Sequence, residues 1–377
     1  MLQIPFNKPF FTGRETEYIQ QVIQSKKIAG DGLFTNKCHR LLEQKYGFKK
    51  VLLTTSCTDA LEMTALLLNI KAEDEVIVPS YTFVSTVNAF VLRGAKIIFA
   101  DSKTDEPNLD EDKLEALITP HTKAIVVVHY AGVACKMEAI MSIANKHNLF
   151  VVEDAAQAFD GFYKDKPLGS IGHLSAFSFH ETKNINCGEG GMIVVNDERF
   201  LQRAEIIREK GTNRSEFLSG KIDKYEWVDT GSSFLPSDIL AAFLYAQLES
   251  ITTIQERRKT IWETYYQQLK PLKEEGIIQL PAIPDYATNN GHIFYILCKD
   301  LDTRNKLTAF LKMKGISVAF HYQSLHQSPF YNSKHDGRLL PNADVYSNTL
   351  LRLPLYFELT EQEVGYITKN IHIFFKA

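Results

Sequence analysis

The chain has few cysteines and no long apolar run. Its five cysteines among 377 residues are widely spaced and form no CxxC pair, which argues against a disulfide framework and against a zinc site. No stretch approaches the 18 apolar residues of a transmembrane helix, and the opening MLQIPFNKPF lacks the apolar core of a signal peptide. We therefore expect a cytoplasmic protein with no membrane partner and no bound metal.

An excess of charge of one sign is also missing. Lys and Arg number 42, Asp and Glu number 45, and the net charge is −3. This balance argues against a nucleic-acid partner bound through bulk charge, although a local cationic pocket for a phosphate remains open.

Several common catalytic signatures are absent as well. The sequence has no glycine-rich dinucleotide fingerprint after its first strand-like run, and no P-loop, HExxH or GxSxG motif. These absences argue against a dinucleotide-binding or P-loop protein, a zinc metalloprotease of the HExxH type and a serine hydrolase of the GxSxG type.

What the sequence does contain is an alternation of short apolar runs with helical patterns. Runs of strand length lie at 51–53, 76–78, 96–100, 124–128, 149–152 and 192–195, with helical patterns at 60–68, 110–118 and 136–147. Continuous apolar runs are typical of strands that are buried on both faces. The pattern predicts an α/β fold with a mostly parallel sheet covered by helices in three layers.

The pattern changes in the last third of the chain. A helical pattern runs from Ser237, a good N-cap, to Lys270 without Gly or Pro, and Pro271 is expected to end it. We interpret this segment as a helix that bridges two domains. The expected division is a large domain over 1–248, then the bridging helix and a small C-terminal α/β domain over 249–377.

Polar segments follow three of the strand-like runs, at the sheet edge where open α/β folds bind ligands. Thr54–Thr58 reads TTSCT and can form an anion cradle at a helix N-terminus, although plain helix capping explains it at least as well. Glu153 and Asp154 end a buried run, where a carboxylate can hold a cationic ring nitrogen or cap the next helix. Lys183 lies in a polar turn beside the glycine-rich bend 188–191.

The order of these three segments is more informative than any one of them. A phosphate cradle, then a strand-end carboxylate, then a lysine is the layout that pyridoxal phosphate requires, because the cofactor needs an anion site, a partner for its pyridinium nitrogen and a lysine for its aldehyde.

The motifs resemble those of the DegT/DnrJ-type sugar aminotransferases, a branch of the fold-type I aspartate aminotransferase superfamily. Matching segments span nearly the whole chain, from Pro5-Phe6 to Leu353–Leu355. They include GDG at 30–32, PSYTFV at 79–84, EDAAQ at 153–157, FSFHETKN at 177–184 and GEGG at 188–191.

The resemblance implies a role for each matching residue. Lys183 would form the Schiff base with pyridoxal phosphate and act as the catalytic residue. Asp154 would pair with the pyridinium nitrogen, Gln157 would contact the ring hydroxyl, and Phe83 would stack on the ring. Ser56, Cys57, Thr58 and Ser178 would hold the phosphate, joined by Ser232 from the partner subunit of a homodimer, where the family usually has Asn. Substrate contacts are expected from Gly30, Asp31, His321 and His326, the two histidines being equally open to a structural role.

The resemblance also implies a reaction. The runs TSCT, PSYTFVST, FHETKN and REKGTNRS are most similar to the subgroup that moves the amino group of L-glutamate to C4 of dTDP-4-keto-6-deoxyglucose, giving dTDP-4-amino-4,6-dideoxygalactose for a bacterial surface polysaccharide such as the enterobacterial common antigen or lipopolysaccharide. The alternatives are the 4-amino-4,6-dideoxyglucose epimer and amination at C3. Lys183 disfavours a sugar dehydratase of the same fold, in which a histidine replaces the lysine, and a non-enzymatic PLP-binding regulator.

Overall fold

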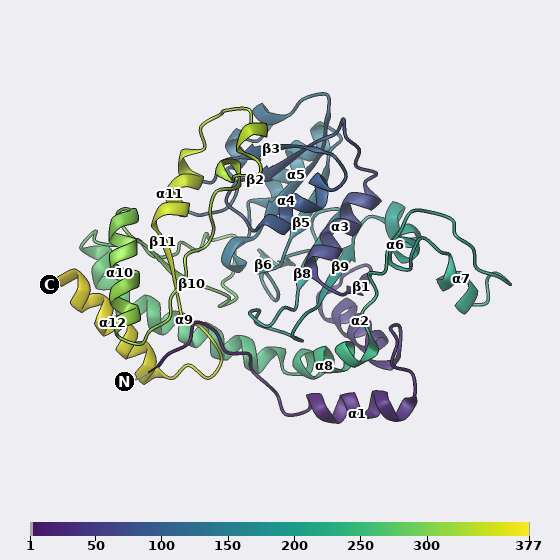
Figure 1. Cartoon of the computed structure of the whole chain (residues 1–377), viewed down its shortest axis with the longest axis horizontal. Helices are drawn as coiled ribbons and strands as arrows, with labels where there is room; N and C mark the ends of the chain where they lie inside the picture. The colour runs from purple at the N-terminus through teal and green to yellow at the C-terminus, as the bar shows by residue number, and fades with distance from the viewer. Residues whose placement is uncertain (1–2, 377) are drawn as a thin grey trace.

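The computed structural model describes residues 3–376 and is built around a seven-stranded sheet (Figure 1). The strand order is β1-β9-β8-β5-β4-β2-β3. All neighbouring pairs are parallel except the two that involve β9, which runs antiparallel to β1 and β8. The strands are β1 (Val51–Thr54), β2 (Glu75–Pro79), β3 (Lys96–Ala100), β4 (Thr122–Val128), β5 (Phe150–Asp154), β8 (Leu174–Ser178) and β9 (Gly191–Val195). The predicted mostly parallel sheet is confirmed.

Helices cover both faces of this sheet, because the side chains of each strand alternate between two cores. One core contains Ile125 and Val127 with residues of α1 (Glu15–Ser25), α2 (Leu33–Tyr46), α5 (Met137–Lys146) and α8 (Asp238–Glu249). The other contains Ala124 and Val126 with residues of α3 (Cys57–Leu67), α4 (Val84–Val91) and α6 (Leu201–Arg208). The three-layer arrangement expected from the continuous apolar runs is therefore present.

A third core belongs to the C-terminal part of the chain. It joins the second half of α9 (Ile251–Glu274) to the antiparallel pair β10 (Phe294–Leu297) and β11 (Leu350–Leu353), and to α10 (Leu301–Met313) and α12 (Glu361–Lys376). In Figure 1, α8 and α9 run along one side of the molecule from the sheet to these helices. The division between 248 and 249 remains a prediction. Shorter elements are the hairpin β6 (Phe162–Tyr163) and β7 (Lys166–Pro167), and the helices α7 (Arg214–Leu218) and α11 (Pro341–Thr349).

Two expected helices differ in the structure. The segment 110–118 forms two short 3-10 turns, Glu111–Lys113 and Glu115–Leu117, because Pro120 disfavours helical geometry just beyond them. The bridging helix is broken at Ser250, and α9 continues past Pro271 to Glu274. A proline in the last turn removes a single backbone hydrogen bond, so the helix tolerates it there.

Other features can be stated only for the part of the chain that is described. Over residues 3–376, none of the helices combines the length and apolar character that crossing a bilayer needs. The same residues contain no group of three His, Cys, Asp or Glu side chains arranged to hold a metal ion.

Candidate active site

A cavity of about 430 Å³ opens at the carboxyl ends of the parallel strands. It brings together most of the residues expected to act on the cofactor, although they come from segments that are far apart in the sequence. Those lining it are Ser56, Cys57, Thr58, Phe83, Asp154, Gln157, Ser178 and Lys183, together with His321 from the expected substrate contacts.

Four expected site residues lie outside this cavity. Asp31 pairs with Arg208 and lines a separate cavity of about 160 Å³. Gly30 packs tightly against Leu235, and Ser232 is tied by its backbone to the segment after α6. His326 is only 6% exposed, and its Nδ1 lies 2.8 Å from Ser80 Oγ. Within one chain, these residues do not meet Lys183.

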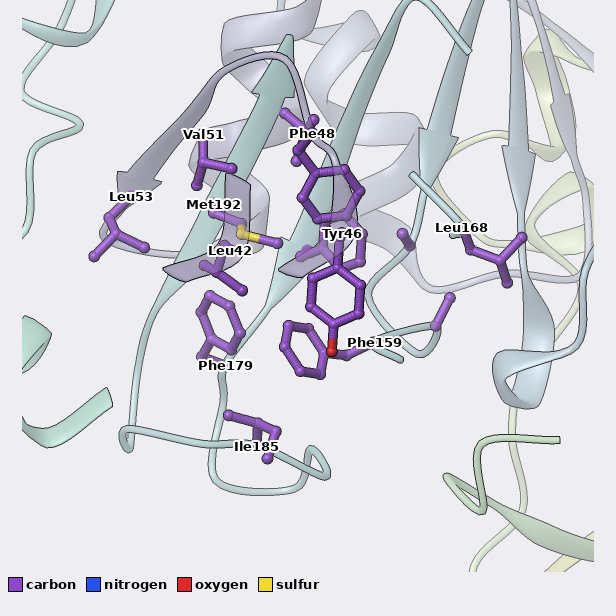
Figure 2. Packing of buried hydrophobic residues seen from close by; sticks show 14 of the residues in the cluster. Leu42, Tyr46, Phe48, Val51, Leu53, Phe159, Leu168, Phe179, Ile185 and Met192 are labelled. Carbon is purple, nitrogen blue, oxygen red and sulfur yellow. The ribbon is translucent and has the colours of Figure 1, made fainter. Parts of the chain in front are cut away.

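Lys183 lies on a loop between β8 and β9 that is fixed on both sides. Phe179 and Ile185 are buried in the core that Figure 2 shows, so the loop is anchored before and after the lysine. Asn184 adds hydrogen bonds of 2.7 Å to His292 and 2.8 Å to Gln255. Burial lowers the pKa of Lys183 to about 8, with the charge of Arg352 adding to this effect. The lowered pKa increases the fraction of neutral amine near neutral pH, and the neutral amine is the nucleophilic form.

Asp154 is the last residue of β5 and faces the cavity. Its Oδ2 accepts a 2.6 Å hydrogen bond from Thr86 Oγ1, and its Oδ1 accepts one of 3.1 Å from the Ala156 N–H. Burial raises the pKa of Asp154, while these two donors and the Lys183 charge oppose the rise. The carboxylate is thus held in place with lone pairs left for a cationic partner.

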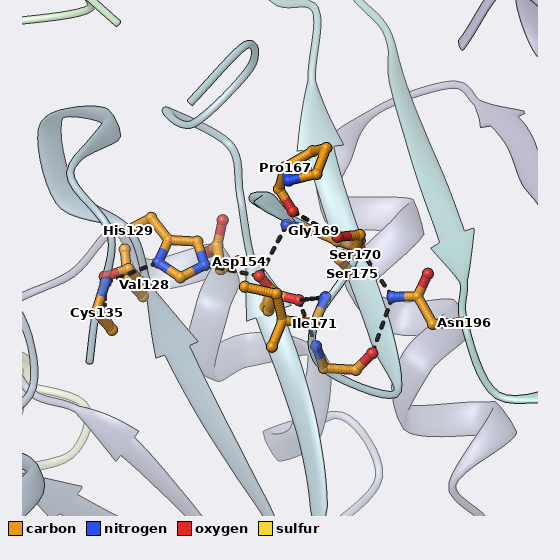
Figure 3. Close-up of polar contacts among 12 residues, drawn as sticks. Val128, His129, Cys135, Asp154, Pro167, Gly169, Ser170, Ile171, Ser175 and Asn196 are labelled. Carbon is orange, nitrogen blue, oxygen red and sulfur yellow. Dashed lines mark hydrogen bonds and ion pairs between the residues drawn. The ribbon is translucent and has the colours of Figure 1, made fainter. Parts of the chain in front are cut away.

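Glu153, the neighbouring carboxylate, points to the opposite face of β5. It accepts hydrogen bonds from the backbone N–H groups of Gly169, Ile171 and Gly172 at 2.5–2.8 Å. His129 Nδ1 accepts from the Cys135 N–H, so His129 Nε2 carries the proton that Glu153 accepts at 2.9 Å. Figure 3 shows His129 and the turn with Gly169 and Ile171 approaching β5 from two sides. Glu153 is fully buried and accepts hydrogen bonds from four donors, so we assign it a structural role.

The N-terminus of α3 lines the cavity and has the geometry expected of an anion cradle. Ser56 caps the helix by accepting a 3.0 Å hydrogen bond from the Asp59 N–H, so the capping interpretation is correct. Capping leaves the N–H groups of Cys57 and Thr58 without a carbonyl partner in the helix, and the helix dipole favours an anion there. A Cβ at Gly191 would collide with the backbone of Ser56 and Cys57. Glycine at this position therefore keeps β9 close to the cradle, and Ser178 completes the wall.

The remaining walls suit a flat ring. Phe83 is 54% exposed at the N-terminus of α4 and lines the cavity, although an aromatic side chain is usually more buried. In the same cavity, Gln157 Nε2 donates a 2.9 Å hydrogen bond to the Tyr322 hydroxyl, and Gln157 Oε1 accepts from the Ala131 N–H at 2.6 Å. These contacts hold the amide of Gln157 at the cavity wall.

The sequence did not point to a buried arginine beside the site. Arg352 on β11 is 8% exposed, and Nη1 donates to His321 Nδ1 at 2.6 Å. Burial and the charges of Arg352 and Lys183 lower the pKa of His321 to about 2, so the imidazole is neutral and can accept this bond. Within residues 3–376, no carboxylate pairs with Arg352, and its buried Nε has no hydrogen-bond partner. Arg352 is far from Lys183 in the sequence, and no motif around it indicated a site residue.

This donor set fits pyridoxal phosphate. The cradle of α3 suits the phosphate, Asp154 suits the ring nitrogen, and Lys183 supplies an amine within the same cavity. Only glycine fits at position 191, because a Cβ there would collide with the backbone of Ser56 and Cys57. The sequence therefore allows the backbone of β9 to approach the cradle closely.

Known proteins share both the sequence pattern and the fold. The model of the DegT/DnrJ/EryC1/StrS aminotransferase family matches residues 11–372. Protein MJ1066 of Methanocaldococcus jannaschii, itself uncharacterized, is 34% identical over 375 residues, which cover 97% of this chain and 96% of the relative.

Solved structures agree with the family match. Spr1654 from Streptococcus pneumoniae in its PLP form superposes with a TM-score of 0.91 at 26% identity, covering 100% of this chain and 99% of that one. PseC of Helicobacter pylori, an aminotransferase involved in the biosynthesis of pseudoaminic acid, gives 0.89 at 25% identity with 100% of both chains covered. The chain is therefore a PLP-dependent enzyme of the sugar aminotransferase type, and it belongs to the DegT/DnrJ/EryC1/StrS aminotransferase family.

Proposed function

We propose that this enzyme transfers the amino group of L-glutamate to C4 of dTDP-4-keto-6-deoxyglucose and forms dTDP-4-amino-4,6-dideoxygalactose. The observation that supports the chemistry best is that Lys183, Asp154 and the α3 cradle line the same cavity. The sugar and its C4 configuration rest on the similarity of TSCT, PSYTFVST and FHETKN to the subgroup with this product.

Each residue of the cavity has a separate task in this reaction. The bound cofactor supplies an electron sink for the carbon that loses a proton. Asp154 keeps the ring nitrogen protonated, which the sink requires. The α3 cradle and Ser178 bind the phosphate, while Phe83 and Gln157 orient the ring. Lys183 would supply the amine that holds the cofactor, and its Nζ would act as general acid and base toward the reacting carbon of the substrate.

Arg352 is the residue best suited to bind the carboxylate of an amino-acid donor. It is a buried cation without an acidic partner among the described residues, next to His321 in the cavity wall. Guanidinium groups bind carboxylates through paired hydrogen bonds. A carboxylate of L-glutamate would supply the partner that the chain does not.

A homodimer would account for the residues that lie outside the cavity. Gly30, Asp31 and Ser232 are displaced from Lys183 in their own chain. The neighbouring loop exposes Trp227 by 81% and Tyr225 by 51%, which suits an interface. We propose that these segments complete the site of the partner subunit, so light scattering should give a dimer, and a fully active monomer would contradict this.

Proton NMR of the product tests the proposed reaction. The enzyme is incubated with L-glutamate and dTDP-4-keto-6-deoxyglucose, and the amino sugar is purified. The galactose configuration places the C4 proton equatorial, so its coupling to the C3 proton should be small. A large coupling would show the glucose epimer. Turnover of the 3-keto isomer without consumption of the 4-keto sugar would reject amination at C4.

A further inference from the structure

Two threonines, Thr82 just before α4 and Thr86 in its first turn, connect the cavity wall to Asp154. Thr82 and Thr86 are four residues apart and nearly inaccessible to solvent, with exposures of 1% and 0%. Their Oγ1 atoms lie 2.8 Å apart, and Thr86 Oγ1 lies 2.6 Å from Asp154 Oδ2. Thr82 also lines the cavity. The two hydroxyls thus form a short chain that ends on the carboxylate.

The direction of this chain follows from counting protons. An ionised carboxylate can only accept hydrogen bonds, so Thr86 must donate its single hydroxyl proton to Asp154. Thr86 then has only lone pairs left for its neighbour, and Thr82 must be the donor in the second bond. Bonds aligned in this way strengthen each other in a buried environment.

Asp154 has few hydrogen-bond donors around it, so the hydroxyl of Thr86 is important for its carboxylate. Asp154 is 5% exposed, and burial of an anion without donors is costly. Within residues 3–376, the donors to its side chain are Thr86 on Oδ2 and the Ala156 N–H on Oδ1. The other titratable groups near it are Lys183, His129, Cys57 and Tyr322. None of these donates a hydrogen bond to Oδ2, so loss of the Thr86 hydroxyl would leave that oxygen without a donor.

We propose that Thr86, oriented by Thr82, is a positioning residue that keeps the Asp154 carboxylate ionised and turned toward the ring nitrogen of the bound cofactor. This inference rests on the role of Asp154 in the proposed function. Thr86 itself does not line the cavity, so it would act only through Asp154.

The test compares Thr86→Val with Thr64→Val. Thr64 is also fully buried, but its hydroxyl bonds only to the Leu61 carbonyl of its own helix. Both substitutions replace a hydroxyl with a methyl group, so they share the general cost of such a change. Thr86→Ser restores the hydroxyl, and Thr82→Val removes only the outer link of the chain.

The first readout needs no bound cofactor. Carboxyl carbon NMR of the apoprotein, with the Asp154 signal assigned by its loss in Asp154→Asn, gives the titration of this group. Thr86→Val should raise the pKa of Asp154 by about one unit or more, Thr82→Val by less, and Thr64→Val should leave it unchanged.

The second readout is single-turnover kinetics. Thr86→Val should slow both half-reactions by roughly 10- to 100-fold, a range consistent with the loss of a charge-assisted hydrogen bond. The KM values should change little, and Thr86→Ser should recover most of the rate. If Thr86→Val matches Thr64→Val in the carboxyl titration and in both rates, the inference is overturned. A wild-type enzyme that turns over no amino donor would instead overturn the proposed function, and the carboxyl titration would still decide the inference.

Discussion

Glu153 and Asp154 are adjacent carboxylates on β5, yet they lie in two different regions of the molecule. Glu153 faces the core between the sheet and α2, α5 and α8, where four donors surround it. Asp154 faces the cavity with two donors and free lone pairs. The pKa of Glu153 is lowered because hydrogen bonds from His129, Gly172 and Gly169 outweigh the effect of burial, whereas burial prevails at Asp154 and raises its pKa.

The difference shows how one strand serves stability and chemistry at once. Because side chains alternate along a strand, neighbouring residues reach opposite faces of the sheet. A saturated carboxylate such as Glu153 ties the strand to the turn 169–172 and to His129. An incompletely satisfied one such as Asp154 stays available to a ligand. Substitution of each should therefore affect different properties.

Asp154→Asn should give the largest effect on activity. Without the negative charge, the ring nitrogen loses the partner that keeps it protonated, so we expect both half-reactions to slow by about 10²–10⁴-fold. The apoprotein should remain as stable as wild type to within about 1 kcal/mol, since a buried charge is removed. Stopped-flow absorbance and thermal unfolding measure the two properties. Unchanged half-reaction rates would assign the ring nitrogen to a different partner.

Glu153→Gln should reverse this pattern. The amide offers one acceptor oxygen where the carboxylate served four donors, and its NH₂ group would face other donors. We expect a loss of roughly 3 kcal/mol of stability, seen as a lower Tm, with the single-turnover rates of the folded protein nearly unchanged. A stable variant with severely reduced rates would show that Glu153 takes part in the chemistry.

The two carboxylates should also respond in opposite directions to acid. The lowered pKa of Glu153 means that it contributes stability above its unfolded value of about 4.3, and this contribution is lost as pH falls through the folded value. The raised pKa of Asp154 means that its protonation relieves an unfavourable buried charge as pH falls. Between pH 7 and 3.5, the Tm of the apoprotein should therefore fall less steeply in Glu153→Gln than in wild type, and more steeply in Asp154→Asn. Parallel curves for all three proteins would remove the distinction.

The sequence predicted the parallel sheet well because its strands are apolar on both faces, which produces continuous runs such as 124–128. It pointed to Lys183, Asp154 and the N-terminus of α3, which the structure brings to one cavity, because each lies within a local motif. The residue types alone did not separate the roles of Glu153 and Asp154. Only the family resemblance assigned the ring nitrogen to Asp154, and the structure adds the hydrogen-bond partners that distinguish the two side chains. Those partners, His129 and Thr86, come from other segments.

Long-range contacts account for the other differences. Tyr322 reaches the cavity from the C-terminal part of the chain. Arg352, on β11, contacts the cavity wall only through its hydrogen bond to His321, and no sequence motif pointed to it. The break between α8 and α9 at Ser250 has no Gly or Pro signal. The segment 110–118 has the composition of a helix, but Pro120 and the burial of Glu111 and Leu114 limit it to short turns.

The most direct test of the active-site assignment is to locate the lysine that holds the cofactor. The protein is reconstituted with pyridoxal phosphate, reduced with borohydride, digested and examined by peptide mass spectrometry. The structure predicts that the added pyridoxyl mass is found on the peptide that contains Lys183 and on no other, and that Lys183→Ala abolishes it. The same mass on a different lysine, or its persistence in Lys183→Ala, would contradict the assignment of this cavity as the site of transamination.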